Sequence, residues 1–273
     1  MSETGEVNPA WRQWRAAAEE LARAAGVLTR RMLAAPRQVQ HKGFRDVVTD
    51  ADFAAQQLIT DGIRQQFPHH GFWAEEENPN LPTEGPVRWL IDPIDGTSNY
   101  ARGIPNYCVS IATAVEEQVV AGVIYDPMTD ELFSALRGQG CALNGQPVTV
   151  SAVNDLGDAI VALDWGRRRP VRAASATTLP RIVHRVKTLR AIGSSALTLA
   201  WVAAGRIDAH ITYELGAWDI AAGQLMIREA GGSVTTAAGA PLPLSARTSC
   251  VSSNGLLHET VLGLVQGVEV AEE

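Results

Sequence analysis

Apolar positions along the chain switch between a helical and a strand-like spacing. Over residues 9–33, apolar side chains recur every three or four positions, which is the period of an amphipathic helix, and a second such pattern runs from Phe53 to Phe67. Short apolar runs at 72–74 and 89–91 predict buried strands. Later apolar runs, separated by charged or glycine-containing turns, predict an antiparallel meander. These runs lie at 107–115, 119–127, 131–138 and near 150.

The rest of the chain mixes the two periods. Strands are expected at 159–164 and 207–213, and a helix at 196–204 ends at Gly205. Another helix runs from Trp218 to Ala230, and a last one lies at about 255–265. Small residues in the first turns of the helix at 218 predict that it packs closely against other backbone. They are Ala221, Ala222 and Gly223.

Composition limits the possible classes of protein. The chain has 273 residues, 46% of them hydrophobic, and a formal net charge of -7. This favours a packed core and disfavours nonspecific binding to nucleic acid or to anionic membranes, so we expect neither partner. No apolar run is long enough to span a bilayer, the N-terminal residues do not resemble a signal peptide, and the scattered Cys108, Cys141 and Cys250 indicate reduced thiols. A cytoplasmic location is expected.

Candidate chemistry centres on the segment WLIDPIDGTSNY, residues 89–100. An apolar strand delivers Asp92 and Asp95 onto a turn that is constrained by Pro93 and Gly96. Asp-Pro and Asp-Gly are ordinary turn dipeptides, so either aspartate alone would indicate only a turn. Two carboxylates three residues apart repel each other and need a compensating partner. Such oxygen ligands suit Mg²⁺, which completes its shell with water and substrate phosphate.

Three other acidic positions allow two interpretations each. Asp46, Asp50 and Asp52 put three carboxylates near the start of a helix, where one of them would face the same site, although Thr49 and Asp52 also fit a structural capping box. The triplet at 75–77 is either a solvated loop or a strand end that presents one Glu inward. Asp219 is either a site residue or the N-cap of its helix.

The most basic segment is WGRRR, residues 165–169, together with Arg172. Arginine clusters are commonly solvated, and we favour an exposed loop. The alternative is a clamp, in which Arg167 and its neighbours bind a second anionic group on a substrate. The six histidines show no spacing typical of metal ligands, and we interpret them as surface or core residues.

Four blocks together resemble the inositol monophosphatase family, in the family's order over residues 42–232. They are the segments at 46–52, 75–76, 92–97 and 218–232. The resemblance covers nearly the whole chain and is greatest to the bacterial inositol-1-phosphate phosphatases. It implies a mixed α/β (α+β) fold, a layered α-β-α-β-α sandwich of the sugar-phosphatase type. We expect one such domain over 1–273, with an N-terminal α+β half at about 9–155 and a C-terminal α/β half at about 156–273.

The resemblance also implies a homodimer that hydrolyses small phosphate monoesters with two or three Mg²⁺ ions and is inhibited by Li⁺. One ion would be held by Glu75, Asp92 and the backbone carbonyl of Ile94. Asp92, Asp95 and Asp219 would hold a second ion.

Further roles follow from the same resemblance. Glu75, with Glu76, would help to hold a third, weaker ion. Thr97, paired with Asp52 or with Asp46, would orient the attacking water, and Glu75 would also serve catalysis.

Substrate contacts are implied as well. The phosphate would meet Asp95 and the amides of Gly96 and Thr97, while Glu214 and Ala196 match positions that touch the hydroxyl-bearing ring of the substrate.

Two departures from the family's pattern concern specificity. Ala74 stands where a glycine is usual, and the segment at 164–169, with Arg167, replaces residues that contact substrate. The leading expectation is hydrolysis of myo-inositol 1-phosphate. Fructose 1,6-bisphosphate, which the arginines would admit, histidinol phosphate and 3′-phosphoadenosine 5′-phosphate are alternative substrates, and a metal-binding regulatory scaffold is the alternative from another class.

Overall fold

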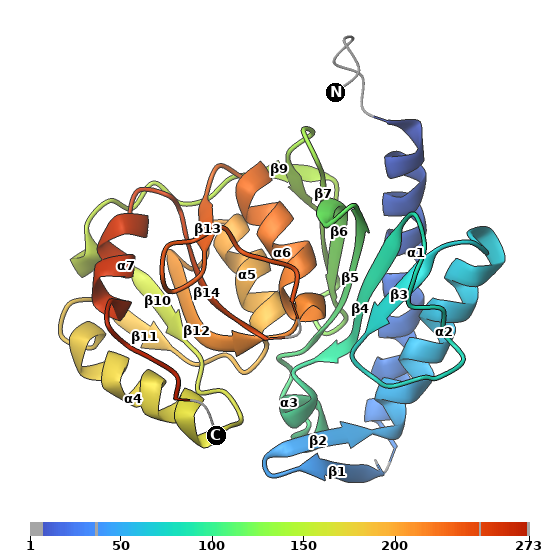
Figure 1. The fold of residues 1–273 in the computed structure, drawn as a ribbon, viewed down its shortest axis with the longest axis horizontal. Coiled ribbons are helices and arrows are strands. Elements are labelled where there is room, and N and C mark those ends of the chain that lie inside the picture. Colours follow the sequence, from blue (N-terminus) through green and yellow to red (C-terminus); the bar gives the residue numbers. More distant parts are fainter. Residues whose placement is uncertain (1–7, 36–37, 246, 272–273) are drawn as a thin grey trace.

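Two layers of sheet alternate with three layers of helix (Figure 1). The computed structural model describes residues 8–35, 38–245 and 247–271. The helices are α1 (Pro9–Leu33), α2 (Asp50–Gln66), α3 (Thr97–Arg102), the 3-10 helix η1 (Leu156–Asp158), α4 (Arg169–Ile182), α5 (Ser195–Ala203), α6 (Ala217–Glu229) and α7 (His258–Val265).

The strands form three sheets. A seven-stranded sheet has the order β3-β4-β5-β6-β7-β8-β9, a five-stranded sheet has the order β11-β10-β12-β14-β13, and β1 pairs with β2. The strands are β1 (Val39–Gly43), β2 (Asp46–Thr49), β3 (Gly71–Ala74), β4 (Arg88–Asp95), β5 (Cys108–Val115), β6 (Gln118–Asp126), β7 (Glu131–Leu136), β8 (Cys141–Leu143), β9 (Gln146–Val148), β10 (Ile160–Leu163), β11 (Thr188–Arg190), β12 (Ala209–Leu215), β13 (Ser233–Thr235) and β14 (Thr248–Ser253).

The five layers are held by three apolar cores. Helices α1 and α2 pack on one face of the seven-stranded sheet, and α5 and α6 fill the space between its other face and the five-stranded sheet. Helices α4 and α7 cover the outer face of the five-stranded sheet. This order confirms the predicted α-β-α-β-α sandwich. Strands β5 to β9 form the predicted antiparallel meander, β4 pairs antiparallel with β5, and β3 is added in parallel to β4.

Strand β4 shows how the apolar pattern positions the acidic turn. Trp89 and Ile91 belong to the core under α1 and α2, whereas Leu90 belongs to the core under α5 and α6. A strand buried on both faces is apolar at every position, which explains the continuous run in the sequence. The strand therefore carries the carboxylates at its end into the centre of the molecule.

The small residues of α6 have the predicted effect. A Cβ placed on Gly122 of β6 would lie 2.8 Å from the Cα of Ala222, and one on Gly223 would lie 2.5 Å from the Cβ of Leu199 in α5. Helix α6 is thus pressed against both a strand and a helix, and its first turn is fixed in place.

The structure corrects the favoured interpretation of the basic segment and rules out one of the two interpretations of Asp219. Arg169 begins α4, so the basic segment runs into a helix rather than lying wholly in a loop. The buried positions of α4 do have helical spacing, but Ser175 and Thr178 are among them, and this hides the apolar period. Asp219 is not the N-cap of α6: Gly216 is, and Asp219 accepts a hydrogen bond from the Gly216 amide at 2.7 Å.

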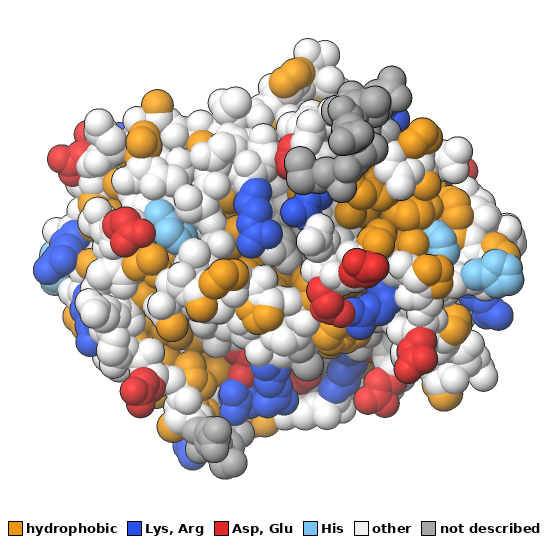
Figure 2. Space-filling model, turned by 45° about the horizontal axis from the view of Figure 1, so that its top comes forward, with side chains coloured by type: hydrophobic (Ala, Val, Ile, Leu, Met, Phe, Trp, Pro, Cys, Tyr) orange, Lys and Arg blue, Asp and Glu red, His pale blue; other side chains and the backbone are white. Residues whose placement is uncertain are grey.

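Charged side chains on the face drawn in Figure 2 are scattered in both signs, and no single basic patch dominates it. None of the helices in the described part of the chain combines the length and apolarity that a membrane span needs. The three cysteines are free, as predicted, and the structure buries all three.

Candidate metal and active site

A β-bulge at the end of β4 turns two carboxylates to the same side. Asp92 lies opposite Ser110 of β5 and Asp95 lies opposite Cys108, so β4 holds one residue more than its partner over this stretch. In a regular strand, residues three apart point to opposite faces. The extra residue of the bulge turns the Asp95 side chain to the same side as that of Asp92, and the two carboxylates converge.

The first turn of α6 adds a third carboxylate. Asp92, Asp95 and Asp219 each offer an oxygen within 4.8 Å of the others. The start of α6 is tied to the sheet because Ser110 donates a hydrogen bond to the carbonyl of Trp218 at 3.2 Å. A helix N-terminus favours a negative charge, which lowers the cost of placing Asp219 there.

Burial and mutual repulsion make these carboxylates poor anions without a partner. Burial, followed by repulsion from neighbouring carboxylates, raises the pKa of Asp92 well above its ordinary value. Burial, followed by repulsion from Asp95 and Glu75, raises the pKa of Asp219 to about 8. None of the ion pairs between described residues includes any of the three. A divalent cation would remove the repulsion, and this all-oxygen donor set fits Mg²⁺.

Asp95 is oriented by the start of α5. The amide of Ala196 donates to Asp95 Oδ2 at 2.7 Å, and the hydroxyl of Ser194 donates to the same oxygen. The Sγ of Cys108 lies 3.8 Å from it. One oxygen of Asp95 is therefore held by protein donors. Burial still raises the pKa of Asp95, although these hydrogen bonds oppose the rise.

A buried hydroxyl and carboxylate lie beside the metal-ligand candidates. The Thr97 hydroxyl is 3.0 Å from the carbonyl of Ile94 and 3.3 Å from Asp52 Oδ1. Asp52 also accepts hydrogen bonds from the amide and hydroxyl of Thr49, at 2.8 and 2.6 Å, so it forms the predicted cap and faces Thr97 at the same time. Burial raises the pKa of Asp52 to about 7.

Gly96 connects the bulge to α3 in a conformation with φ of 101°. A Cβ there would lie 2.9 Å from the carbonyl of Asn106 and 3.2 Å from that of Gly193. Both the backbone conformation and the space require glycine. The turn is thereby held between the β4 bulge and the segment that precedes α5.

The acidic triplet after β3 separates into differently placed side chains. Glu76 is buried and pairs with Lys42 Nζ at 2.5 Å, and Gln56 holds its backbone on both sides. The amide of Glu75 continues the pairing of β3 by donating to the carbonyl of Ile91 at 3.0 Å. Glu77 is exposed. Repulsion from Glu75 contributes to the raised pKa of Asp92.

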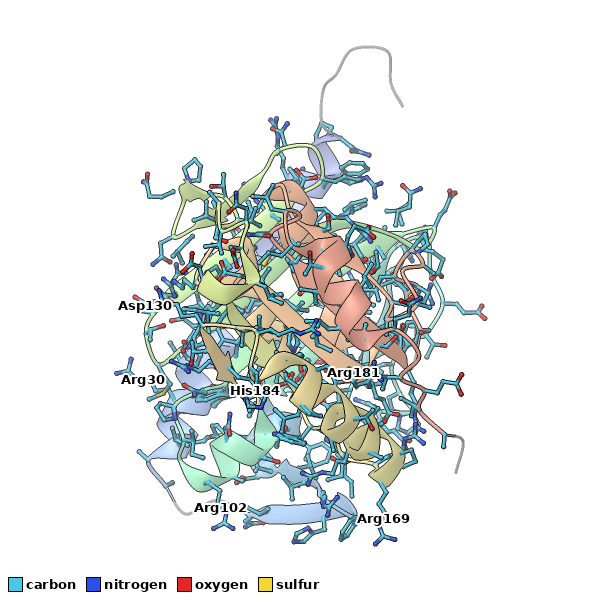
Figure 3. All side chains as sticks on the ribbon, turned by 90° about the vertical axis from the view of Figure 1, so that its left-hand side faces the viewer. Arg30, Arg102, Asp130, Arg169, Arg181 and His184 are labelled. Atoms are coloured by element: carbon cyan, nitrogen blue, oxygen red, sulfur yellow. The ribbon has the colours of Figure 1, made fainter. Side chains whose placement is uncertain are left out.

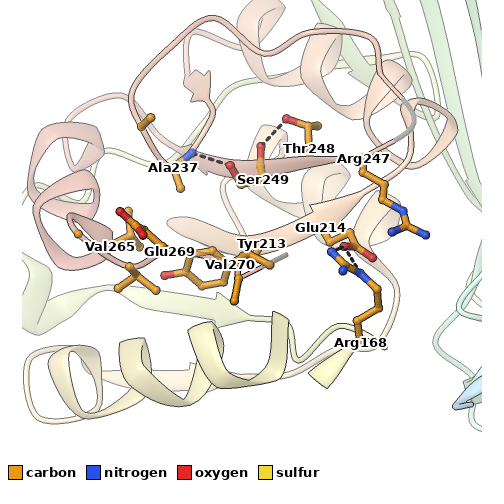
Figure 4. A pocket seen from close by; sticks show the side chains of 14 residues that line it. Arg168, Tyr213, Glu214, Ala237, Arg247, Thr248, Ser249, Val265, Glu269 and Val270 are labelled. Atoms are coloured by element: carbon orange, nitrogen blue, oxygen red, sulfur yellow. Dashed lines mark hydrogen bonds and ion pairs between the residues drawn. The ribbon is translucent and has the colours of Figure 1, made fainter. Parts of the chain in front are cut away.

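The arginines of the basic segment contact carboxylates. Arg167 Nη1 lies 2.8 Å from Asp46 Oδ1, and Nη2 lies 3.7 Å from Glu75 Oε1. Arg168 pairs with Glu214 on β12, with its Nε donating at 2.7 Å (Figure 4). Arg167 and Arg168 therefore each pair with an acidic side chain. They do not form the common anion site that the clamp interpretation requires.

A groove of ≈ 840 Å³ lies next to the Arg168 and Glu214 pair, between β12, the 237–249 segment and the residues after α7 (Figure 4). None of Asp92, Asp95 and Asp219 lines it. The groove is therefore separate from the cluster of converging carboxylates.

Sequence reasoning missed one buried polar cluster. Asp164 Oδ2 accepts hydrogen bonds from Ser195 Oγ at 2.7 Å and pairs with His210 Nε2 at 2.8 Å. His210 was interpreted as a surface or core residue; it lies in the core, paired with this carboxylate. Because Ser194 and Ala196 bind Asp95, the start of α5 is held between Asp95 and Asp164. The sequence feature that could have indicated this cluster is Asp164, a carboxylate directly after the apolar strand β10.

The structure thus brings most of the predicted site residues together. Asp92, Asp95, Asp219, Asp52 and Thr97 lie around one point, with Glu75 beside them. The Ala196 side chain is buried, and its amide is engaged with Asp95. Glu214 lies outside the carboxylate cluster, joined to Arg168. Their contacts with a substrate stay predictions.

Comparison with known proteins agrees with this geometry. A sequence profile described as the Inositol monophosphatase family matches residues 10–269. Inositol monophosphatase 2 of Solanum lycopersicum is 40% identical over 235 residues, 84% of this chain and 89% of that protein. Nus factor SuhB of Escherichia coli is 42% identical over 221 residues, 78% of this chain and 81% of that protein. The solved structure of the Thermotoga maritima IMPase has a TM-score of 0.85 at 34% identity and covers 92% of this chain and 96% of its own. The chain belongs to the inositol monophosphatase family.

Proposed function

We propose that this protein hydrolyses a small phosphate monoester with Mg²⁺, and that myo-inositol 1-phosphate is the substrate. The observation that carries the proposal is the convergence of Asp92, Asp95 and Asp219 within 4.8 Å, without a cationic side chain paired to any of them in the described ion pairs. Residues that served only the fold would not accumulate unpaired buried charge at one point.

The candidate ligands for two ions are Glu75, Asp92 and the Ile94 carbonyl on one side, and Asp92, Asp95 and Asp219 on the other. When bound, Mg²⁺ would neutralise the phosphate and lower the pKa of a water molecule. The chain itself supplies rigidity: the β4 bulge and the start of α5 hold the carboxylates so that a phosphate is positioned before it reacts.

Thr97 and Asp52 are suited to orienting the attacking water. When the Thr97 hydroxyl donates its hydrogen to Asp52, its oxygen is left to accept a hydrogen bond from water. The water oxygen would attack phosphorus while the bond from phosphorus to the substrate oxygen breaks. A carboxylate whose pKa is about 7 takes up a proton readily near neutral pH, so Asp52 is a suitable acceptor.

A monophosphate is favoured over a bisphosphate by the pairing of the arginines. Arg167 and Arg168 already contact carboxylates, so a second phosphate would have to compete with Asp46 and Glu214 for them. Replacing Arg167, Arg168 and Arg169 together would then reduce turnover of fructose 1,6-bisphosphate and inositol 1-phosphate to the same degree. A larger loss on the bisphosphate would return the basic segment to the role of a phosphate clamp.

The relatives named Nus factor SuhB support a second candidate, a regulatory protein that keeps the fold and does not depend on turnover. The intact set of carboxylates, with Thr97 and Asp52 beside it, favours catalysis, because each of them is costly to keep buried. We propose in addition a cytoplasmic homodimer that is inhibited by Li⁺.

Phosphate release from a substrate panel tests the proposal. The panel is inositol 1-phosphate, fructose 1,6-bisphosphate, histidinol phosphate and 3′-phosphoadenosine 5′-phosphate, each with Mg²⁺, with EDTA, and with Mg²⁺ plus Li⁺. We expect release that requires Mg²⁺, is fastest on inositol 1-phosphate and falls with Li⁺. Release from none of the four would refute the proposed hydrolysis and favour the regulatory alternative.

A further inference from the structure

The acidic residues of the site fall into two groups that differ in how their charge is balanced. Asp92, Asp95 and Asp219 converge with no cation among their described partners. Asp46 and Glu75, on the side of the β1–β2 hairpin and β3, face the guanidinium of Arg167. Of the two groups, only the second has a cation at ion-pair distance among the described residues.

We propose that Arg167 is an internal counter-cation that keeps a third metal ion from binding between Glu75 and Asp46, so that the site holds two ions, one of them with Glu75 as a ligand. The inference rests on the proposed Mg²⁺-dependent function and concerns the number of ions bound. Arg167 is held against Asp46 at 2.8 Å and stands 3.7 Å from Glu75, where a further cation on Glu75 would meet it.

Electrostatics decide between the two cations. An arginine keeps its charge at any physiological pH, so it repels a divalent ion that approaches the same carboxylates. Two positive charges that share one pair of carboxylates at this distance repel each other, because Coulomb repulsion is strongest at short range. Arg167 is tethered, whereas the ion must come from solution, and the tethered cation has the advantage.

The loop that carries Arg167 suits this role. It joins β10 to α4 and lies in the other half of the layered structure from Asp46 and Glu75, which it reaches across the site. Gly166, with φ of 63°, makes the turn before it. The Arg167 side chain is 49% exposed, so removing it opens no cavity in the core. Its replacement therefore changes charge rather than packing.

Neighbouring arginines provide a matched control. Arg169 is exposed, begins α4 and points away from the body of the protein (Figure 3). Arg169→Ala removes one positive charge from the same segment without touching Asp46 or Glu75. It separates the loss of a specific counter-cation from a change in net charge.

Counting bound ions tests the inference independently of turnover. Mn²⁺ serves as the probe because it takes the same oxygen ligands as Mg²⁺, and unbound Mn²⁺ is measured by electron paramagnetic resonance after equilibrium dialysis. We expect two ions per chain in the unsubstituted protein and a third in Arg167→Ala, while Arg169→Ala keeps two. The double variant Arg167→Ala with Asp46→Asn should return to two, because the added ion loses a ligand.

Three bound ions in the unsubstituted protein, or the same number in Arg167→Ala as in the unsubstituted protein, would overturn the inference. Failure of the proposed function looks different: phosphate release from the substrate panel would then be absent, whatever the ion count.

Discussion

Replacing Asp95 by Asn tests two things separately: how much the acidic cluster destabilises the metal-free fold, and how much it contributes to Mg²⁺ binding and turnover. Asp95 is 8% exposed and repels Asp92 and Asp219, whose pKa values it raises. Asn is of equal size, and its side-chain oxygen still accepts from Ser194 and Ala196. The fold should survive, while one negative charge is removed from the cluster.

Opposite effects on stability are expected with and without metal. In EDTA at pH 8, relief of repulsion should raise the free energy of unfolding of Asp95→Asn by about 1 to 2 kcal/mol, the equivalent of roughly one unit of pKa in a neighbour. In Mg²⁺, the unsubstituted protein should gain about 2.7 kcal/mol once the ion is at 100 times its dissociation constant, and the variant should gain much less. Turnover should fall at least about 1,000-fold, since a lost ligand removes several kcal/mol of charge stabilisation.

Urea unfolding in EDTA and in MgCl₂, together with phosphate release, measures all three quantities. Asp61→Asn, at an exposed position of α2, is the control for loss of one charge and should change none of them appreciably. The reasoning would be refuted if Asp95→Asn were less stable than the unsubstituted protein in EDTA, if Mg²⁺ stabilised both equally, or if turnover stayed near normal.

Three further changes probe the support of the site. Ser194→Ala removes a donor to Asp95 and should weaken Mg²⁺ binding about tenfold with little change in melting temperature, measured by calorimetry with Ser194→Thr as the control. Gly96→Ala should cost about 2 kcal/mol or more in urea unfolding, whereas Gly138→Ala, which also has positive φ but open space around it, should cost about 1 kcal/mol. The folded protein holds the pKa of Asp52 at about 7, against an ordinary 3.8, so between these pH values it binds more protons than the unfolded chain. The free energy of unfolding of the metal-free protein should therefore fall from pH 4 to pH 7, by up to about 4 kcal/mol through this group. Asp52→Asn should remove that part of the pH dependence, measured by urea unfolding in EDTA.

The sandwich was implied by the family resemblance, whereas the apolar patterns predicted individual helices and strands wherever the spacing was clear. Strand β4 is apolar at Trp89, Leu90 and Ile91, which lie in the core before the acidic turn, and the buried positions of α1 keep a helical period. Helix α4 was missed because its buried face includes Ser175 and Thr178. The β1–β2 hairpin was missed because every residue of β1 is exposed, so no alternation marks it.

The local motifs of the site could be predicted from the sequence, but the way the fold brings them together could not. The segment at 92–97 announces a constrained acidic turn, but the convergence of Asp92 and Asp95 depends on a bulge that is defined only by pairing with β5. Likewise, a basic segment does not reveal its partners. Arg167 and Arg168 select Asp46 and Glu214, which are distant in the sequence, and only the folded structure brings these pairs together.

The contrast among the protein's own carboxylates is the strongest argument for a ligand at the centre. Where a partly or fully buried acid serves the fold, the chain supplies a cation or a donor: Lys42 meets Glu76, Arg168 meets Glu214, and Arg206 meets Glu131. At the end of β4 and the start of α6, carboxylates from segments far apart in sequence converge, and none of the ion pairs among the described residues includes them. The cluster therefore lowers the stability of the metal-free fold, and a cation that binds only the native state would restore that stability. A protein with such a site is least stable when no cation is bound, so measurements with and without Mg²⁺ are the direct way to test its function.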